Sequence, residues 1–212
     1  PADRAAFLQF NLNVWQANSR DPLFDMATYD ARVFEPDFDA LAELPCYLGV
    51  DMSLSGDLTA VVAAWRHDDD QITVHPWLFV PGDDLKGRAD RDGLPYEEWR
   101  DAGLIFVTPG PIIDAGLIED QPLNMGVAAG DLERTVNGDL IRHADHAALR
   151  QHFDSVVASR NPTSGLIRMH KGKKTDRIDG AIAAAMAVSR ACAAETNVSK
   201  YNAPEAEGLF IF

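Results

Sequence analysis

The chain has 212 residues, of which 46% are hydrophobic and 25% are charged, as in an ordinary globular domain with a full core. This composition predicts one domain with flanking segments, and no apolar run suggests a membrane span or a signal peptide. The formal net charge of −14 argues against strong nucleic-acid binding by the chain as a whole.

Residues 1–46 are expected to form a linker segment ahead of the main domain, which we place at residues 47–193. Within the linker, residues 26–33 predict a short helix. Residues 34–44 are acidic, and Pro36 and Pro45 interrupt regular structure there. This pattern predicts a connector that runs over the domain surface.

Three apolar runs predict antiparallel strands at residues 47–51, 59–66 and 72–80. A turn of Ser and Gly, residues 53–57, follows the first run. Residues 68–70 are three consecutive aspartates between the second and third runs. We interpret them as a solvated hairpin tip, because consecutive side chains on a turn diverge and do not converge on a metal ion.

The second half of the sequence alternates short helices with extended pieces. Residues 81–92 are polar and glycine-containing, and they predict a mobile loop. Residues 194–212 lack periodicity and predict a tail whose apolar end, residues 209–212, docks on the domain or on a partner. The other expected elements are helices at 96–102, 125–136 and 147–157, strands at 105–108 and 140–143, and a strand or hairpin arm at 166–169.

The apolar residues of these elements predict the core. Cys46 and Cys192 fall in separate core elements, so we expect two buried free thiols of an intracellular protein and no disulfide. The predicted core includes Leu48, Val50, Val61, Ala63, Ile72, Val74, Leu78, Ile105, Val107, Ile182 and Met186.

Asp51 stands where the first strand should end, a position from which a carboxylate can point out of the sheet edge. One carboxylate holds a divalent ion poorly, because Mg²⁺ prefers near-octahedral oxygen ligation. The sequence therefore predicts a second acidic cluster elsewhere in the chain.

Asp176 and Asp179 form the best match for that cluster. They precede and open an alanine-rich helix, residues 181–188, and alanine is the best helix former. A purely structural interpretation also holds, because acidic residues in a first turn favour the positive end of the helix dipole. On their own, these two residues favour the structural interpretation.

A basic segment lies directly before Asp179. It suggests a phosphate backbone laid against the acidic cluster, although a charge run is more often a solvated loop. The segment contains Arg160, Arg168, His170, Lys171, Lys173, Lys174 and Arg177. Three other histidines, His143, His146 and His152, lack zinc-motif spacing and a nearby cysteine, so we do not expect a zinc site.

Three stretches resemble the C-terminal nuclease domain of the large terminase subunits of tailed phages, in the same order. They are Phe-Leu-Gln-Phe-Asn-Leu-Asn-Val-Trp at 7–15, Leu-Gly-Val-Asp-Met-Ser at 48–53 with Asp-Leu-Thr-Ala at 57–60, and Arg-Ile-Asp-Gly at 177–180. The resemblance covers nearly the whole chain. It implies an RNase H-like α/β fold, with a mixed central sheet flanked by helices.

The resemblance also implies a function and a site. Concatemeric viral double-stranded DNA would be cut during genome packaging, with two Mg²⁺ or Mn²⁺ ions. Asp51 would ligate both ions, Asp179 one, and Asp176 would act as an outer or alternative ligand. Implied partners are the packaging ATPase domain, the small terminase subunit and the portal, in the host cell cytoplasm. No Gly-x-x-x-x-Gly-Lys-Ser/Thr motif occurs, so we do not expect the ATP motor in these residues.

The chain departs from the family pattern between Asp120 and Gln121. The family pattern has a helix there, then a buried strand that ends in a second catalytic acidic residue. A few tens of residues are missing on that pattern, and we expect them to be absent from the printed sequence rather than deleted from the protein. The second catalytic carboxylate is therefore not assigned to any residue.

Two alternatives remain open at this point. Gly49-Val50-Asp51-x-Ser53 with Gly56 and Thr59 also resembles the first phosphate loop of actin-like ATPases and sugar kinases. That fold requires a second such domain and a second glycine-rich loop, which we do not find. A non-catalytic docking module would use the acidic surface to bind a basic partner.

Overall fold

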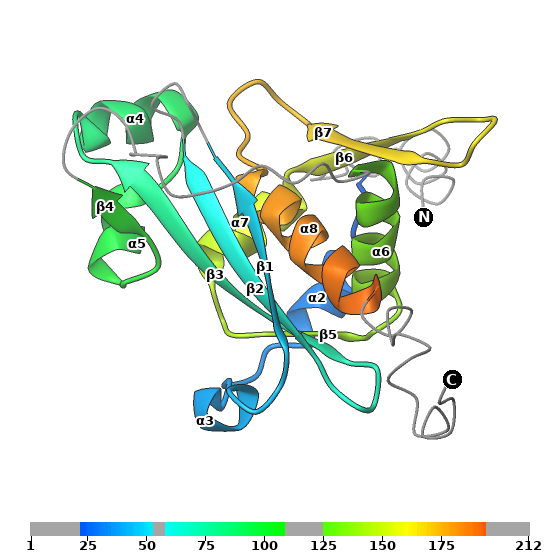
Figure 1. The fold of residues 1–212 in the computed structure, drawn as a ribbon. Coiled ribbons are helices and arrows are strands. Elements are labelled where there is room, and N and C mark those ends of the chain that lie inside the picture. Colours follow the sequence, from blue (N-terminus) through cyan, green and yellow to red (C-terminus); the bar gives the residue numbers. More distant parts are fainter. Residues whose placement is uncertain (1–21, 53–57, 109–124, 194–212) are drawn as a thin grey trace, which may run out of the picture.

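The structure, a computed structural model, describes residues 22–52, 58–108 and 125–193. A central sheet carries α8 and α6 on one side, with α8 between the sheet and α6 (Figure 1). The helices are α2 Met26–Asp30, α3 Phe38–Leu41, α4 Leu85–Asp92, α5 Tyr96–Asp101, α6 Met125–Asn137, α7 Ala147–Asp154 and α8 Asp179–Ala193. The strands are β1 Cys46–Asp51, β2 Thr59–Arg66, β3 Ile72–Pro81, β4 Phe106–Thr108, β5 Ile141–His143, β6 Val156–Arg160 and β7 Ile167–Lys171.

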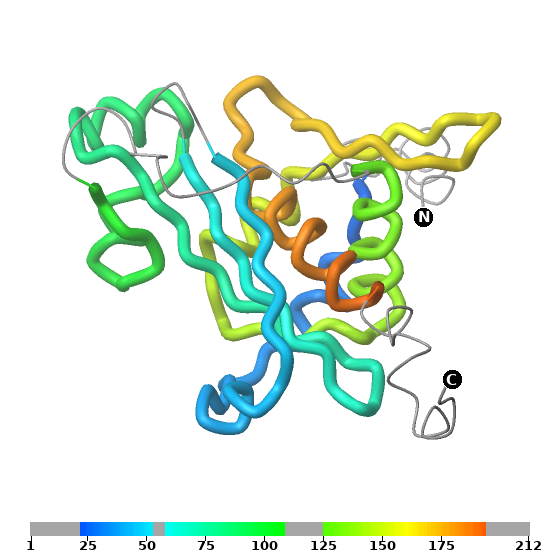
Figure 2. Tube along the Cα trace, in the orientation of Figure 1, coloured from blue at the N-terminus to red at the C-terminus, as the bar shows by residue number. Residues whose placement is uncertain are grey.

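The sheet opens with the antiparallel order β1-β2-β3, which confirms the three predicted strands. β4 and β5 both pair with β3 in parallel, β4 near its end and β5 near its start. A separate hairpin, β6–β7, projects beside α6, as the chain path in Figure 2 shows. The mixed sheet flanked by helices confirms the expected fold class.

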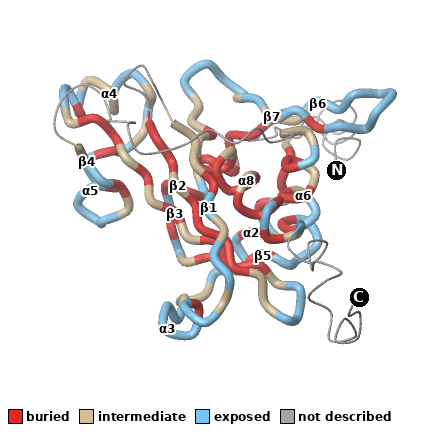
Figure 3. Tube along the Cα trace, in the orientation of Figure 1, coloured by how far each residue is buried: buried red, intermediate tan, exposed pale blue. Residues whose placement is uncertain are grey.

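A close approach of α8 to β1 determines how the sheet is covered. A Cβ atom on Gly49 would lie 1.9 Å from the carbonyl oxygen of Ala183 and 2.8 Å from the amide nitrogen of Ala187. Only glycine fits at this position, and the alanine side chains of α8 allow the short distance. Figure 3 shows α8 buried between the sheet and α6.

This packing corrects part of the predicted core. Alternation along β1 turns Gly49 toward α8, so Leu48 faces the other side of the sheet and is 59% exposed. Val107 on β4 is also exposed, and Cys46, expected to be buried, lies exposed at the start of β1. Both cysteines are free, as expected. Ala63, Ile72, Val74, Leu78 and Ile105 are buried as predicted.

The segment predicted as a mobile loop contains α4. The Asp84 side chain accepts a hydrogen bond from the Gly87 amide, and Gly93 ends the helix in the left-handed conformation with φ +66°. The helix is polar around most of its surface, and Leu85 is its buried residue. The predicted helix at 147–157 ends earlier, at Asp154, because Val156 begins the hairpin.

None of the helices in the described part of the chain is both long and apolar enough to cross a bilayer. Several expectations fall on residues outside the described ranges. They are the first part of the linker at 1–46, the turn at 53–57, the proposed gap after Asp120 and the tail at 194–212.

Candidate functional site

Asp51 and Asp179 lie at the same end of the contact between β1 and α8. Figure 1 shows the two elements running in opposite directions, with the end of β1 beside the start of α8. Asp51 follows Gly49 by two residues on the same face of the strand, about 6.6 Å further along. Asp179 precedes Ala183 by four residues on the same face of the helix, about 6 Å further along. The two carboxylates therefore lie on facing surfaces.

Both carboxylates are partly withdrawn from solvent, and the Asp179 Oδ2 atom is buried. Their chemistry fits a hard divalent cation, since Mg²⁺ in proteins is usually held by one or two carboxylates together with water and substrate phosphates. Within residues 22–52, 58–108 and 125–193, no three His, Cys, Asp or Glu side chains form a complete metal cage.

Asp176 occupies a turn immediately before α8. Its Oδ2 accepts a hydrogen bond of 2.7 Å from the Lys173 amide, and its own amide donates to the Lys173 carbonyl at 3.1 Å. These bonds shape the loop that leads from β7 to Asp179.

The basic segment runs along β7 and continues into the loop that leads to the start of α8 (Figure 1). Residues 160–177 contain six Lys and Arg against one Asp, so this segment is strongly positive within a chain of net charge −14. Arg168, Lys173 and Lys174 are exposed and Lys171 is half-buried. We call these cations the cationic strip, which leads along the chain to Asp179 at the start of α8.

Arg160 of this segment already pairs with Glu133. Arg177 also has a carboxylate partner. It forms a largely buried ion pair with Asp92 at the end of α4, with distances of 2.7 and 2.8 Å between Nη2 and the two carboxylate oxygens. The Tyr96 hydroxyl donates to the same carboxylate at 2.8 Å. This network ties α4 and α5 to the loop that carries Asp179.

The three histidines considered as zinc ligands have structural contacts instead. His143 stacks on Tyr29 with ring centroids 3.8 Å apart. His146 caps α7, and its Nδ1 accepts from the Leu149 amide at 3.1 Å. His152 is fully buried on α7, and its Nδ1 accepts from the Gly180 amide at 2.8 Å.

The two buried rings of α7 predict a loss of stability in mild acid. Burial lowers the pKa of His152 to about 3 and that of His146 to about 4, from an ordinary value of 6.5. Between about pH 6.5 and 4 the unfolded chain therefore binds two protons that the folded chain does not. The free energy of unfolding is therefore highest above pH 6.5. It decreases as pH falls, by about 2–3 kcal/mol per pH unit from these two groups.

Urea unfolding at pH 7, 6 and 5 measures this slope. His146→Asn keeps a capping side chain and removes one titrating ring, so it should flatten the slope by about half. His170→Asn, a change at an exposed histidine, is the matched control and should leave the slope unchanged. An equal slope in His146→Asn and the unaltered chain would contradict the assignment.

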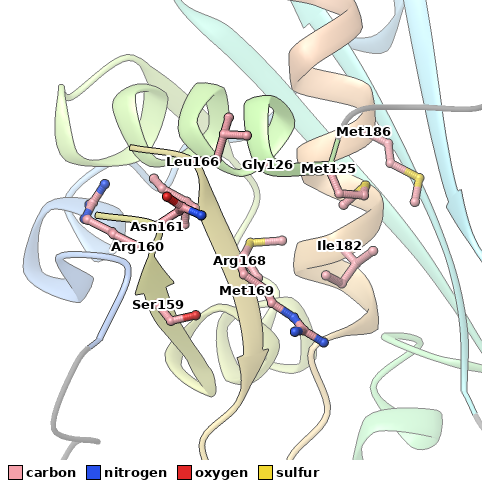
Figure 4. Close-up of a pocket in the computed structure, with 11 residues that line it drawn as sticks. Met125, Gly126, Ser159, Arg160, Asn161, Leu166, Arg168, Met169, Ile182 and Met186 are labelled. Atoms are coloured by element: carbon pink, nitrogen blue, oxygen red, sulfur yellow. The ribbon is translucent and has the colours of Figure 1, made fainter. Parts of the chain in front are cut away.

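A pocket of about 620 Å³ lies between α6, α8 and the hairpin. Figure 4 shows methionines from three elements around it, Met125, Met169 and Met186. Arg160 and Arg168 also line it, and no carboxylate among the residues that the structure describes does so. The pocket is mainly apolar and is distinct from the site of Asp51 and Asp179.

Sequence analysis assigned no role in the site to three residues that shape it: Asp92, His152 and Gly180. A Cβ atom on Gly180 would lie 2.9 Å from His152 Nδ1 and 3.0 Å from Leu149 Cδ1, so glycine permits the contact between α7 and α8. The Asp-Gly pair at 179–180 was the available local signal. No local pattern indicates Asp92 or His152, because their partners are 85 and 28 residues away in sequence.

The family model described as terminase large subunit, endonuclease domain, matches residues 1–128. The large terminase subunit of Enterobacteria phage HK97 is 28% identical over 187 residues, an alignment that covers 68% of this chain and 37% of that protein. The chain therefore spans well under two thirds of the length of this relative.

One solved structure gives a similar result. The crystal structure of the HK97 bacteriophage large terminase matches with a TM-score of 0.69 at 25% identity, over 90% of this chain and 47% of that chain. The large terminase nuclease from thermophilic phage G20c with bound magnesium has a TM-score of 0.42 at 12% identity, over 80% of this chain and 97% of that chain.

Proposed function

Because the chain belongs to the terminase large-subunit endonuclease domain family, we propose that it cleaves concatemeric viral double-stranded DNA during genome packaging, with divalent metal ions. The observation that carries the proposal is the juxtaposition of Asp51 at the end of β1 and Asp179 at the start of α8, to which the cationic strip leads. Family membership favours this hypothesis over the actin-like or sugar-kinase alternative.

We propose Asp51 and Asp179 as the ligands of Mg²⁺ or Mn²⁺, with two ions at the site. Asp51 would contribute to both ions and Asp179 to one, with Asp176 in an outer position and a further carboxylate outside the described residues. When bound, such ions stabilise the attacking and leaving oxygens of an in-line phosphodiester displacement. The chain's own residues hold the negative charge in place and keep the two carboxylates on facing, closely packed elements.

The DNA backbone would lie along the cationic strip. Arg168, Lys171, Lys173, Lys174 and Arg177 are the proposed contacts. Arg177 differs from the other four, because Asp92 accepts its hydrogen bonds and its removal should also cost fold stability. The positive charge of this segment contrasts with the net charge of −14 of the chain, which would direct DNA to the carboxylates.

The other partners follow from the family. We propose the packaging ATPase domain, the small terminase subunit and the portal as partners, in the host cell cytoplasm. A docking role for the acidic surface is compatible with cleavage, because the two would use different faces.

The test of the function is plasmid cleavage by the purified chain in Mn²⁺, Mg²⁺ and EDTA. Relaxation or linearisation in either metal, absent in EDTA, is the expected result. A folded chain that cuts in neither metal, and also fails to bind Mn²⁺, would contradict the proposal and favour the docking module.

Neutralising two exposed lysines tests the DNA path. Lys173→Ala combined with Lys174→Ala should weaken DNA binding. The slope of log K against log salt concentration should become less negative by about 2, since each phosphate contact contributes about −0.9. Titrations of a labelled duplex at several salt concentrations measure both quantities. Arg100→Ala, which also removes positive charge, is the control on α5 and should change neither. An unchanged slope in the double variant would place the DNA elsewhere.

A further inference from the structure

The start of α8 lacks an ordinary side-chain cap. The Ile178 carbonyl accepts from the Ala181 and Ile182 amides, both at 2.9 Å, so Ile178 occupies the N-cap position of α8. Helices usually carry Ser, Thr, Asp or Asn there, with an oxygen that accepts from an amide of the first turn. Ile178 has no such atom and is 7% exposed in the core.

His152 supplies the missing acceptor from another helix. Its Nδ1 accepts from the Gly180 amide at 2.8 Å, one residue after Asp179. Because an amide can only donate, the ring carries its proton on Nε2 rather than Nδ1. Burial also keeps the ring neutral, since it lowers the pKa of His152 to about 3.

Packing alone does not explain a histidine at this position. The ring is fully buried, and its Nε2 has no hydrogen-bond partner among the residues that the structure describes. A buried, unpartnered N–H group is costly, and a phenyl ring would fill the space without that cost. What histidine provides and a phenyl ring does not is the acceptor for Gly180.

We propose that His152 is a positioning residue for the metal site, because it holds the first turn of α8 and thereby the carboxylate of Asp179. The role rests on the proposed function, in which Asp179 is a ligand. His152 touches neither metal nor DNA and acts through the Gly180 amide. Groups that orient a metal ligand typically change metal affinity by about 10- to 100-fold when they are removed.

Two variants of the full chain separate positioning from packing. His152→Phe keeps a ring in the core and removes the acceptor. His152→Asn keeps an acceptor oxygen near the place of Nδ1 but leaves a cavity, so it should be the less stable of the two. The proposal predicts the opposite order for metal affinity, measured with Mn²⁺ by electron paramagnetic resonance or calorimetry. His152→Phe should bind Mn²⁺ about 10- to 100-fold more weakly than the unaltered chain does. His152→Asn should bind Mn²⁺ with nearly the affinity of the unaltered chain.

Amide exchange gives a second readout that is independent of metal. In nuclear magnetic resonance spectra of the metal-free chain, the Gly180 amide should exchange faster in His152→Phe and stay protected in His152→Asn. Equal protection in both variants, or Mn²⁺ affinity that follows stability, would overturn the role of His152. If the unaltered chain bound no Mn²⁺, the proposed function itself would fail, and the positioning role with it. If only the role of His152 is wrong, the unaltered chain still binds Mn²⁺.

Discussion

Replacing Asp51 or Asp179 by asparagine is expected to abolish metal-dependent DNA cleavage while the fold stays intact. Asparagine has the same shape but carries no charge, so it removes one anionic ligand and leaves the packing of β1 on α8 unchanged. A metal ion contributes several kcal/mol to the stabilisation of the transition state, and about 4 kcal/mol corresponds to a 10³-fold change in rate. We therefore expect each variant to lose cleavage by about 10³-fold or more.

The thermal midpoint separates a site residue from a structural one. Two carboxylates on facing surfaces repel each other when no metal is bound, so each variant should melt at or above the temperature of the unaltered chain in EDTA. Asp68→Asn is the matched control, because it makes the same chemical change at the exposed hairpin tip. It should leave cleavage and melting unchanged. Near-normal cleavage by Asp51→Asn or Asp179→Asn would remove that residue from the site.

The strands and the last helix were predictable because their signals are local. The apolar runs at β1, β2 and β3 and the alanine-rich pattern of α8 each specify an element without knowledge of its neighbours. The positions of Asp51 and Asp179 at the ends of those elements were predictable for the same reason. Their juxtaposition rested on the resemblance and not on any pattern within either stretch.

The face of β1 was not predictable from its own residues. Leu48, Gly49 and Val50 are all apolar, so the run shows no alternation to decide which side is buried. The decision comes from α8, whose backbone approaches so closely that only glycine fits beneath it. Leu48 is turned outward as a consequence.

The helix α4 was missed for a related reason. Its sequence is polar around most of its circumference, with Leu85 as the buried residue, and contains Gly87, so it lacks the wide apolar stripe of a core-facing helix. The carboxylate that ties its end to the rest of the domain, Asp92, bonds to Arg177 far along the chain. Sequence reasoning of a local kind cannot detect such a partner.

Among glycine-to-alanine substitutions in the described part of the chain, Gly49→Ala is expected to be the most damaging. The new Cβ atom would lie 1.9 Å from the Ala183 carbonyl oxygen, and because that atom is backbone, the whole of α8 must move. Overpacking of this kind costs about 3 kcal/mol, a large part of the 5–15 kcal/mol by which domains are stable. Because α8 carries Asp179, Mn²⁺ affinity should fall together with stability.

Gly130→Ala on α6 is the control for this prediction. The nearest atoms to its new Cβ are Arg134 Nη1 at 3.8 Å and Ile167 Cδ1 at 4.0 Å, which are ordinary contacts. In a helix interior the same substitution should stabilise by about 0.5–1 kcal/mol, because alanine loses less backbone entropy than glycine. The urea concentration at the midpoint of unfolding should therefore fall for Gly49→Ala and rise for Gly130→Ala. If Gly49→Ala unfolded at the urea concentration of the unaltered chain, α8 would not lie against β1 at this distance, and the facing arrangement of Asp51 and Asp179 would lose its basis.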